Sequence, residues 1–212
     1  MSRHYPDPPI ISSQPPSDSQ RVPGEDKQAG ALTQMNYDGQ LGAEVDLMAR
    51  YSSDDARGSY SKEPLWPKGK MPDVQTKQCQ PYIEWHMPQE LKTKAIQIIY
   101  SGGAYQGNAP DGFEVAPVRR YLNAKGMTVV TMKYRTPRPE GELAKHTSAW
   151  QDLQRAIRMA RSQAAAKGLD PNQIGIMGSS AGGHLTLMGA TSSKQRSYWP
   201  IDHLDQLSCQ VQ

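Results

Sequence analysis

The sequence has 212 residues, enough for one domain with a sizeable core, and a formal net charge of +3. This small charge is spread along the chain without a block of Lys and Arg, which excludes proteins that bind nucleic acid through a strongly basic surface. A hydrophobic fraction of 36% and a mean hydropathy of −0.72 are low for a compact domain, so part of the chain is expected to be solvated.

Residues 1–62 are predicted to form a disordered or loosely packed segment, because Pro, Ser, Asp, Gln and Gly dominate and no apolar period persists. Gln40–Tyr51 has the spacing of a short helix, expected to be transient. Residues 1–20 lack the apolar core of a signal peptide, so the protein as written is expected in the cytoplasm. A secreted or periplasmic location would require a different start site. No run of about 18 apolar residues predicts a membrane helix, and no membrane partner is expected.

Residues 63–212 are expected to form the N-terminal portion of an α/β domain, with order beginning near Leu65. A short strand is predicted at Tyr82–His86. Ala95–Tyr100 is a β-branched apolar run that ends at a glycine-containing turn, which is typical of a buried strand. A helix is then predicted from Pro117, at its first position, to Gly126. Its apolar residues at helical spacing are Val118, Tyr121 and Leu122.

Met127–Tyr134 is predicted to be the next buried strand, and the clearest helix follows it. Ser148 and Gln151 fit a capping box at the start of this helix. The residues expected on its core face are Trp150, Leu153, Ile157 and Ala160. Those expected to face water are Gln154, Arg155 and Arg158.

Ile174–Met177 is predicted to be another strand, followed after a tight turn by a helix from Ala181 to about Gly189. Strands and helices thus alternate along residues 63–212. Alternation of this kind is typical of a mostly parallel sheet with right-handed crossovers, which places helices on both faces. The predicted fold class is therefore α/β.

The turn between the last strand and helix has the pattern Gly178-x-Ser180-x-Gly182, which is that of a nucleophile elbow. Very small residues are needed at both glycine positions because the backbone doubles back on itself. We therefore predict Ser180 as a catalytic nucleophile, with the N–H of Ala181 as one donor of an oxyanion hole.

The second part of the hole is expected in the loop after an earlier strand, where Gly102, Gly103 and Ala104 supply candidate backbone N–H groups. A phosphate-binding loop is the competing interpretation of residues 178–183. It is rejected because His184-Leu185 stands where a P-loop has its lysine. Cys79 and Cys209 have no zinc spacing, and whether they form a disulfide or stay free thiols is left open. No metal or cofactor is expected.

Several segments together resemble the acetyl xylan esterase-like α/β-hydrolases, which are related to the prolyl oligopeptidase-group hydrolases. The similar segments are Leu65-Trp66-Pro67, 100–105, 133–135, 151–158 and 175–185. The resemblance implies a partial α/β-hydrolase fold over about residues 63–210. Relatives commonly have Pro-Gly-Gly-Gly where this sequence has Ser101 and Ala104, and alanine leaves the backbone N–H available.

The resemblance also implies a triad in the order Ser, acid, His, but only 32 residues follow Ser180. Their only histidine apart from His184 is His203, preceded by Asp202. We expect the chain to be C-terminally truncated before the family's acid and base, with reduced or absent activity.

The predicted function is hydrolysis of carboxylic esters, with carbohydrate acetyl esters as the expected small-molecule or carbohydrate substrate. A peptidase or other acyl hydrolase of the same fold, or a non-catalytic hydrolase fragment, remain alternatives.

Overall fold

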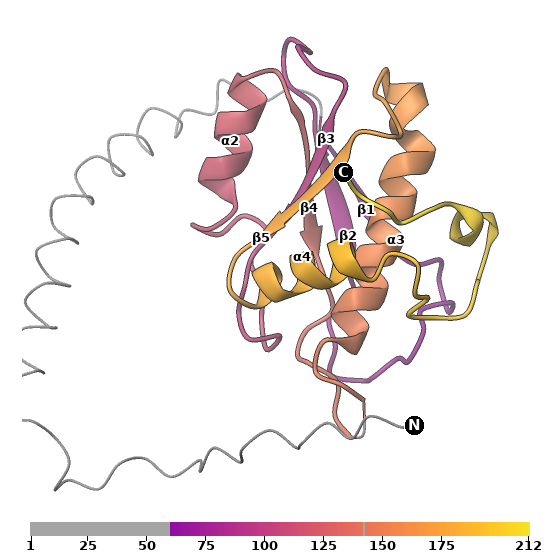
Figure 1. Cartoon of the computed structure of the whole chain (residues 1–212). Helices are drawn as coiled ribbons and strands as arrows, with labels where there is room; N and C mark the ends of the chain where they lie inside the picture. Colours follow the sequence, from indigo (N-terminus) through magenta and orange to yellow (C-terminus); the bar gives the residue numbers. More distant parts are fainter. Residues whose placement is uncertain (1–59, 142) are drawn as a thin grey trace, which may run out of the picture. The chain divides into compact units, whose positions relative to one another are not determined.

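The computed structural model of the chain describes residues 60–141 and 143–212 (Figure 1). The short helix expected at Gln40–Tyr51 lies outside these residues, as do residues 1–59 of the N-terminal segment. No helix in the described ranges is long and apolar enough to cross a membrane.

Five strands form one mixed sheet in the order β1-β2-β4-β3-β5. The strands are β1 (Tyr60–Pro64), β2 (Tyr82–His86), β3 (Ile96–Tyr100), β4 (Thr128–Lys133) and β5 (Ile174–Gly178). β3 pairs in parallel with both β4 and β5, whereas β2 is antiparallel to β1 and β4. The four predicted strands are therefore confirmed, with ends that differ by one residue at most. β1 is an addition, and it starts within the segment predicted to be loose.

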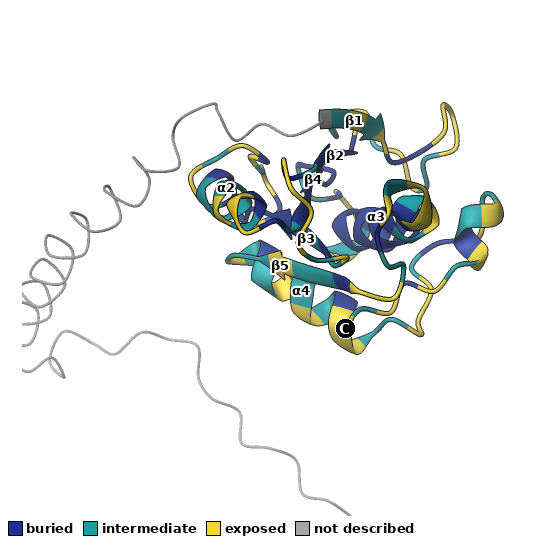
Figure 2. Cartoon of the chain, turned by 90° about the horizontal axis from the view of Figure 1, so that it is seen from above, coloured by how far each residue is buried: buried dark blue, intermediate teal, exposed yellow. Residues whose placement is uncertain are grey.

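Helices cover both faces of the sheet, as predicted (Figure 2). α2 (Ala116–Ala124) packs on one face, and α3 (Thr147–Ala164) and α4 (Ala181–Thr191) pack on the other. A short 3-10 turn, η3 (Ala165–Lys167), extends α3, and a second, η4 (His203–Gln206), packs against α3.

The alternation of side chains along the strands produces two cores. Ile96, Ile98 and Tyr100 of β3 face α3 and α4 in the larger core, whereas Ile99 faces α2 together with Val129. This two-sided burial explains why the central strands are almost continuously apolar. The sheet thus fixes the position of the loops that leave the ends of β3 and β5.

The start of α2 differs slightly from the prediction. The helix begins at Ala116, which places Pro117 at its second position. Val118 and Leu122 pack against the smaller core, but Tyr121 is exposed. Gly126 has φ +79° just after the helix, a left-handed conformation that favours glycine.

The polar face predicted for α3 was wrong. Gln154, Arg155 and Arg158 are all buried, because groups far away in the sequence meet them. Arg155 forms an ion pair with Asp202, at 2.6 Å between Nη2 and Oδ2, and another with Asp205 at 3.2 Å. Arg158 donates to the hydroxyl of Tyr198 at 2.9 Å.

The capping box predicted at the start of α3 is also absent. His146 is the N-cap residue and makes no side-chain cap. Ser148 Oγ instead accepts a hydrogen bond from Gln78, and Gln151 Oε1 accepts one from Arg135. Both side chains are buried, so their polar groups serve tertiary contacts instead of the helix end.

Arg135 and Asp152 form a fully buried ion pair at the centre of this polar network. The guanidinium Nε lies 3.0 Å from Oδ1 of Asp152, and Trp66 donates its Nε1–H to the same oxygen at 2.7 Å. The pair joins the end of β4 to α3. The two cysteines, Cys79 and Cys209, are free thiols.

Candidate active site

Ser180 lies between β5 and α4 with a backbone conformation of φ 50° and ψ −118°. Positive φ is unfavourable for a residue with a side chain and is found where surrounding structure imposes it. The strand before Ser180 and the helix after it impose that conformation here, which is the geometry of a nucleophile elbow. The residue is exposed at the surface.

Gly178 and Gly182 are glycines because their neighbours leave no room for a side chain. A Cβ on Gly178 would lie 2.6 Å from the ring of Tyr100, and one on Gly182 would lie 2.8 Å from the carbonyl oxygen of Ser101. Both distances are shorter than any normal contact. The two predicted elbow glycines thus also let β5 and α4 approach the end of β3.

The loop after β3 lies directly against the elbow. A Cβ on Gly102 would lie 2.8 Å from both the Cβ of Ser180 and the carbonyl oxygen of Ser179. Gly103, Ala104 and Tyr105 all have positive φ, at 120°, 51° and 60°. This run of unusual conformations turns the loop sharply beside Ser180, where the sequence predicted oxyanion donors.

Hydrogen bonds to Ser101 fix the position of the loop after β3. The hydroxyl of Tyr134 donates to the carbonyl oxygen of Ser101 at 3.0 Å, and the N–H of Ala109 donates to Ser101 Oγ at 2.8 Å. Gly103 O accepts the N–H of Gln106 at 2.8 Å, which closes the turn. Such preorganisation is what an oxyanion hole requires, since donors that are already fixed need no rearrangement during reaction.

The four predicted oxyanion donors are not equivalent. The N–H of Gly102 donates to the carboxylate of Glu114 at 2.9 Å and lies 3.3 Å from Ser179 Oγ. Within residues 60–141 and 143–212, the N–H groups of Gly103, Ala104 and Ala181 have no acceptor. Those three are therefore open to a ligand in this structure, whereas that of Gly102 is occupied. Sequence reasoning missed Glu114, because nothing in its local pattern marks a loop contact.

Histidines near the elbow make contacts other than a hydrogen bond to Ser180. His184, one helical turn after Ser180, has its Nδ1 2.8 Å from the hydroxyl oxygen of Tyr105. His146 lies beside it, with 5.4 Å between the ring centroids. Burial, and next the neighbouring His184, lower the pKa of His146 below its ordinary value.

Asp202 and His203, which follow Ser180 in the sequence, lie at the start of η4. Asp202 caps η4 and pairs with Arg155, and the guanidinium holds the pKa of its carboxyl below the ordinary value. His203 is exposed on η4. In the part of the chain that the structure describes, no histidine hydrogen-bonds Ser180, so the structure does not assemble a triad there.

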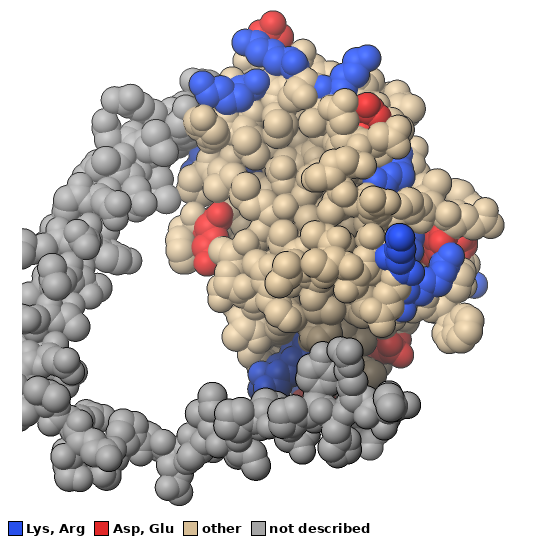
Figure 3. Space-filling view, viewed as in Figure 1, with Lys and Arg blue, Asp and Glu red and all other residues tan. Residues whose placement is uncertain are grey.

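The surface over β5 and α4 is almost free of charge, with Lys, Arg, Asp and Glu gathered around its rim (Figure 3). Neither element contains a charged residue. Leu187 and Met177 are exposed on this surface. A neutral, partly apolar approach to Ser180 suits an uncharged ester better than an ionic substrate.

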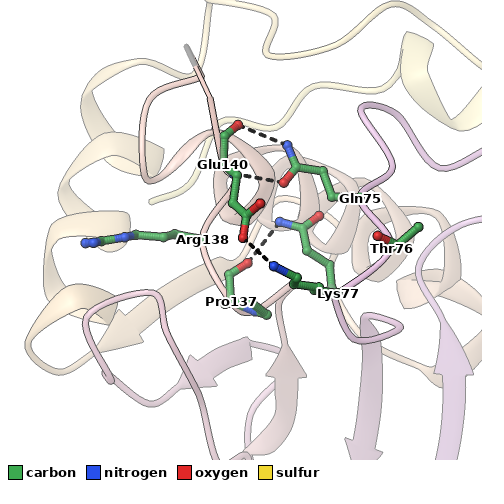
Figure 4. A pocket seen from close by; sticks show the side chains of 7 residues that line it. Gln75, Thr76, Lys77, Pro137, Arg138 and Glu140 are labelled. Atoms are coloured by element: carbon green, nitrogen blue, oxygen red, sulfur yellow. Dashed lines mark hydrogen bonds and ion pairs between the residues drawn. The ribbon is translucent and has the colours of Figure 1, made fainter.

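A pocket lined by residues 75–78, 137–138 and 140 lies apart from Ser180 and is too small for an organic ligand (Figure 4). Its volume is about 40 Å³, close to the space that one water molecule occupies. Glu140 bonds to Gln75 through its backbone N–H and carbonyl oxygen, and to Lys77 through its carboxylate. The described residues contain no cluster of three or more His, Cys, Asp or Glu side chains that would hold a metal.

Comparison with known proteins agrees with this geometry. The model of the BD-FAE family matches residues 83–210, which is more than half of the chain and includes both the elbow and the loop after β3. The chain belongs to the BD-FAE family. The predicted resemblance to acetyl xylan esterase-like α/β-hydrolases is thereby confirmed, as is the assignment to a family of carboxylic ester hydrolases.

This BD-FAE chain is similar to an acetylxylan esterase of Xylanibacter ruminicola, with 30% identity over 108 residues, 50% of this chain and 21% of that protein. Among solved structures, it is similar to an acetyl ester-xyloside bifunctional hydrolase of Caldicellulosiruptor lactoaceticus. Identity there is 29% and the TM-score 0.58, covering 74% of this chain and 55% of the other.

A thermophilic esterase of Thermogutta terrifontis with bound propionate is similar at 25% identity and a TM-score of 0.56, covering 71% and 51% of the two chains. The BD-FAE chain therefore spans about half the length of these solved structures, and about a fifth of the curated relative. The partial α/β-hydrolase fold predicted from the sequence is confirmed.

Proposed function

We propose that Ser180 is the nucleophile of a serine esterase that acts on acetyl esters of carbohydrate. The observation that carries the proposal is the position of Ser180 on a strained elbow, next to a loop whose Gly103 and Ala104 N–H groups have no acceptor among the described residues. The names of the similar proteins, an acetylxylan esterase and an acetyl ester-xyloside hydrolase, support the choice of substrate.

In the proposed reaction, Ser180 Oγ attacks the ester carbonyl carbon and gives up its proton to a general base. The carbonyl oxygen becomes negatively charged and accepts hydrogen bonds from the N–H groups of Gly103, Ala104 and Ala181. The C–O bond to the sugar then breaks, the sugar oxygen takes the proton, and an acetyl group stays on Ser180. Water hydrolyses this acyl-enzyme to acetate and restores the serine.

No general base contacts Ser180 in the ranges that the structure describes. A serine hydroxyl without a base is a poor nucleophile at neutral pH, and oxyanion hole and binding alone supply roughly 10³-fold acceleration. Because no histidine in the described ranges contacts Ser180, we expect residues 60–212 by themselves to turn over esters slowly. The observation that no base contacts Ser180 among the described residues also favours a second candidate function, in which the chain binds esters without hydrolysing them.

Hydrolysis of p-nitrophenyl acetate by the purified chain tests the proposal. The expected result is a slow rate that is lost in Ser180→Ala and kept in Ser208→Ala, which removes an exposed serine close to the end of the sequence. A rate that is the same in Ser180→Ala would contradict the serine mechanism. No rate in any variant, with ester binding still detectable, would favour the second candidate.

A further inference from the structure

A groove of about 770 Å³ lies between two loops, residues 70–73 and residues 196–201. The second loop follows the C-terminal end of α4, and the two loops lie beside α3 (Figure 1). None of the residues that line the groove belongs to the elbow or to the loop after β3. The groove is thus distinct from the elbow.

Trp199 is the most unusual residue of the groove, since 90% of its surface is exposed. The other three tryptophans, Trp66, Trp85 and Trp150, are at most 9% exposed. An indole ring in a groove of ligand size is a platform for a flat, partly apolar ligand.

The loops on both sides of the groove are held by one buried side chain. Gln151, only 1% exposed, donates through Nε2 to Asp73 Oδ2 at 2.7 Å and to the carbonyl oxygen of Ser197 at 3.0 Å. Arg135 holds the carbonyl oxygen of Pro72 at 2.5 Å. Because these anchors are fixed before a ligand arrives, binding needs little ordering of the protein.

The charged groups around Trp199 are of both signs. Asp73 provides a carboxylate on one loop, while Lys70 and Arg196 provide cations. Opposed charges beside a single aromatic ring do not favour an anion or a cation. They offer hydrogen-bond acceptors and donors at the rim of an apolar platform, which matches a pyranose ring with its C–H face and its outward hydroxyl groups.

We propose that this groove binds an uncharged saccharide chain, with one sugar ring stacked on Trp199. The proposal rests on the proposed function for its ligand class: a polysaccharide held at the groove would bring its other residues, and their acetyl esters, toward Ser180. Asp73 accepts hydrogen bonds from sugar hydroxyls, and Lys70 and Arg196 donate to them. Binding itself requires neither Ser180 nor a general base.

Acrylamide quenching of tryptophan fluorescence tests this directly, because Trp199 is the one exposed tryptophan of the four. Adding xylohexaose to the full chain is expected to protect the fluorescence from acrylamide, and calorimetry should show binding. Trp199→Ala should weaken that binding by about tenfold or more, the effect typical of an aromatic hot spot. Asp73→Asn should weaken it less, and Leu91→Ala, which removes an exposed apolar side chain from the loop between β2 and β3, should not change it.

These measurements distinguish a failure of the groove proposal from a failure of the proposed esterase function. Ser180→Ala should bind xylohexaose normally, so retained binding in a chain without esterase activity supports the groove alone. If xylohexaose gives no protection, or binds equally to Trp199→Ala, the groove proposal is overturned, whatever the reactivity of Ser180. Unchanged circular dichroism and melting of Trp199→Ala would show that its loss of binding is local.

Discussion

The hydroxyl oxygen of Tyr105 lies 2.8 Å from Nδ1 of His184, which ties the loop after β3 to the first turn of α4. The loop carries the predicted oxyanion donors, and the helix carries Ser180 at its start. The ring of Tyr105 is buried, and this burial raises the pKa of its hydroxyl to about 12. The hydroxyl therefore stays protonated at neutral pH. The contact therefore holds the two halves of the site together.

Replacing Tyr105 with Phe removes this tie while keeping the ring. We expect the reaction of Ser180 with a fluorophosphonate to slow by about tenfold or more, because small displacements of a positioned group are costly. The free energy of unfolding should fall by only about 1 kcal/mol, as for one hydrogen bond. Tyr121→Phe on α2 is the matched control. Equal labelling of both variants would show that the tie does not position the site.

Gly102→Ala should damage the site more than its size suggests. The new Cβ would lie 2.8 Å from the Cβ of Ser180, so the loop must move away from the elbow. Gly107→Ala in the same loop meets nothing within 4 Å and is the control. We expect Ser180 labelling to be lost in Gly102→Ala and kept in Gly107→Ala, with both proteins folded by circular dichroism. Normal labelling of Gly102→Ala would refute the close approach.

Asp152→Asn should be strongly destabilising, because it leaves the buried guanidinium of Arg135 without its counter-charge. Breaking a buried pair on one side typically costs about 3–5 kcal/mol. The double variant Arg135→Met with Asp152→Leu should recover part of that loss, since no charge is then stranded. Urea unfolding measures both, and Lys77→Gln, which breaks a surface pair, should change little. A mild effect of Asp152→Asn would contradict the role given to the pair.

Stability should decrease as the pH falls below about 6.5, and His86 is one cause. Burial, and next the charge of Arg119, lower the pKa of His86 to about 3 in the folded protein. The unfolded chain binds a proton at this residue between pH 6.5 and 3 and the folded chain does not, so acid favours unfolding. This residue alone contributes up to about 1.4 kcal/mol per pH unit in that window. His86→Gln should flatten the dependence of the free energy of unfolding on pH, measured by urea unfolding between pH 7 and 5. An unchanged slope would show that His86 is not a cause of this dependence.

The four central strands were predictable because each is a short apolar run that ends at a turn residue. The elbow was predictable for a related reason, since its glycines stand between such a strand and a helix. β1 was missed because Tyr60–Pro64 contains Lys62, Glu63 and Pro64, a composition tolerated at the edge of a sheet that gives no apolar signal.

The polar side of α3 could not be predicted from helical spacing. Arg155 is buried because Asp202 and Asp205, more than 40 residues later, supply its counter-charges. Local periodicity assigns a charged residue to water whenever its partner is distant in the sequence. The same limit hid Glu114, whose contact with Gly102 N–H spans 12 residues and follows no repeat.

The central claim is that Ser180 is the reactive nucleophile of this domain. It is tested most directly by incubating the full chain with a fluorophosphonate probe and mapping the adduct by peptide mass spectrometry. We predict one adduct, on Ser180 and not on the neighbouring Ser179, formed slowly and abolished by Ser180→Ala. No adduct after prolonged incubation, or an adduct on another serine, would contradict the claim.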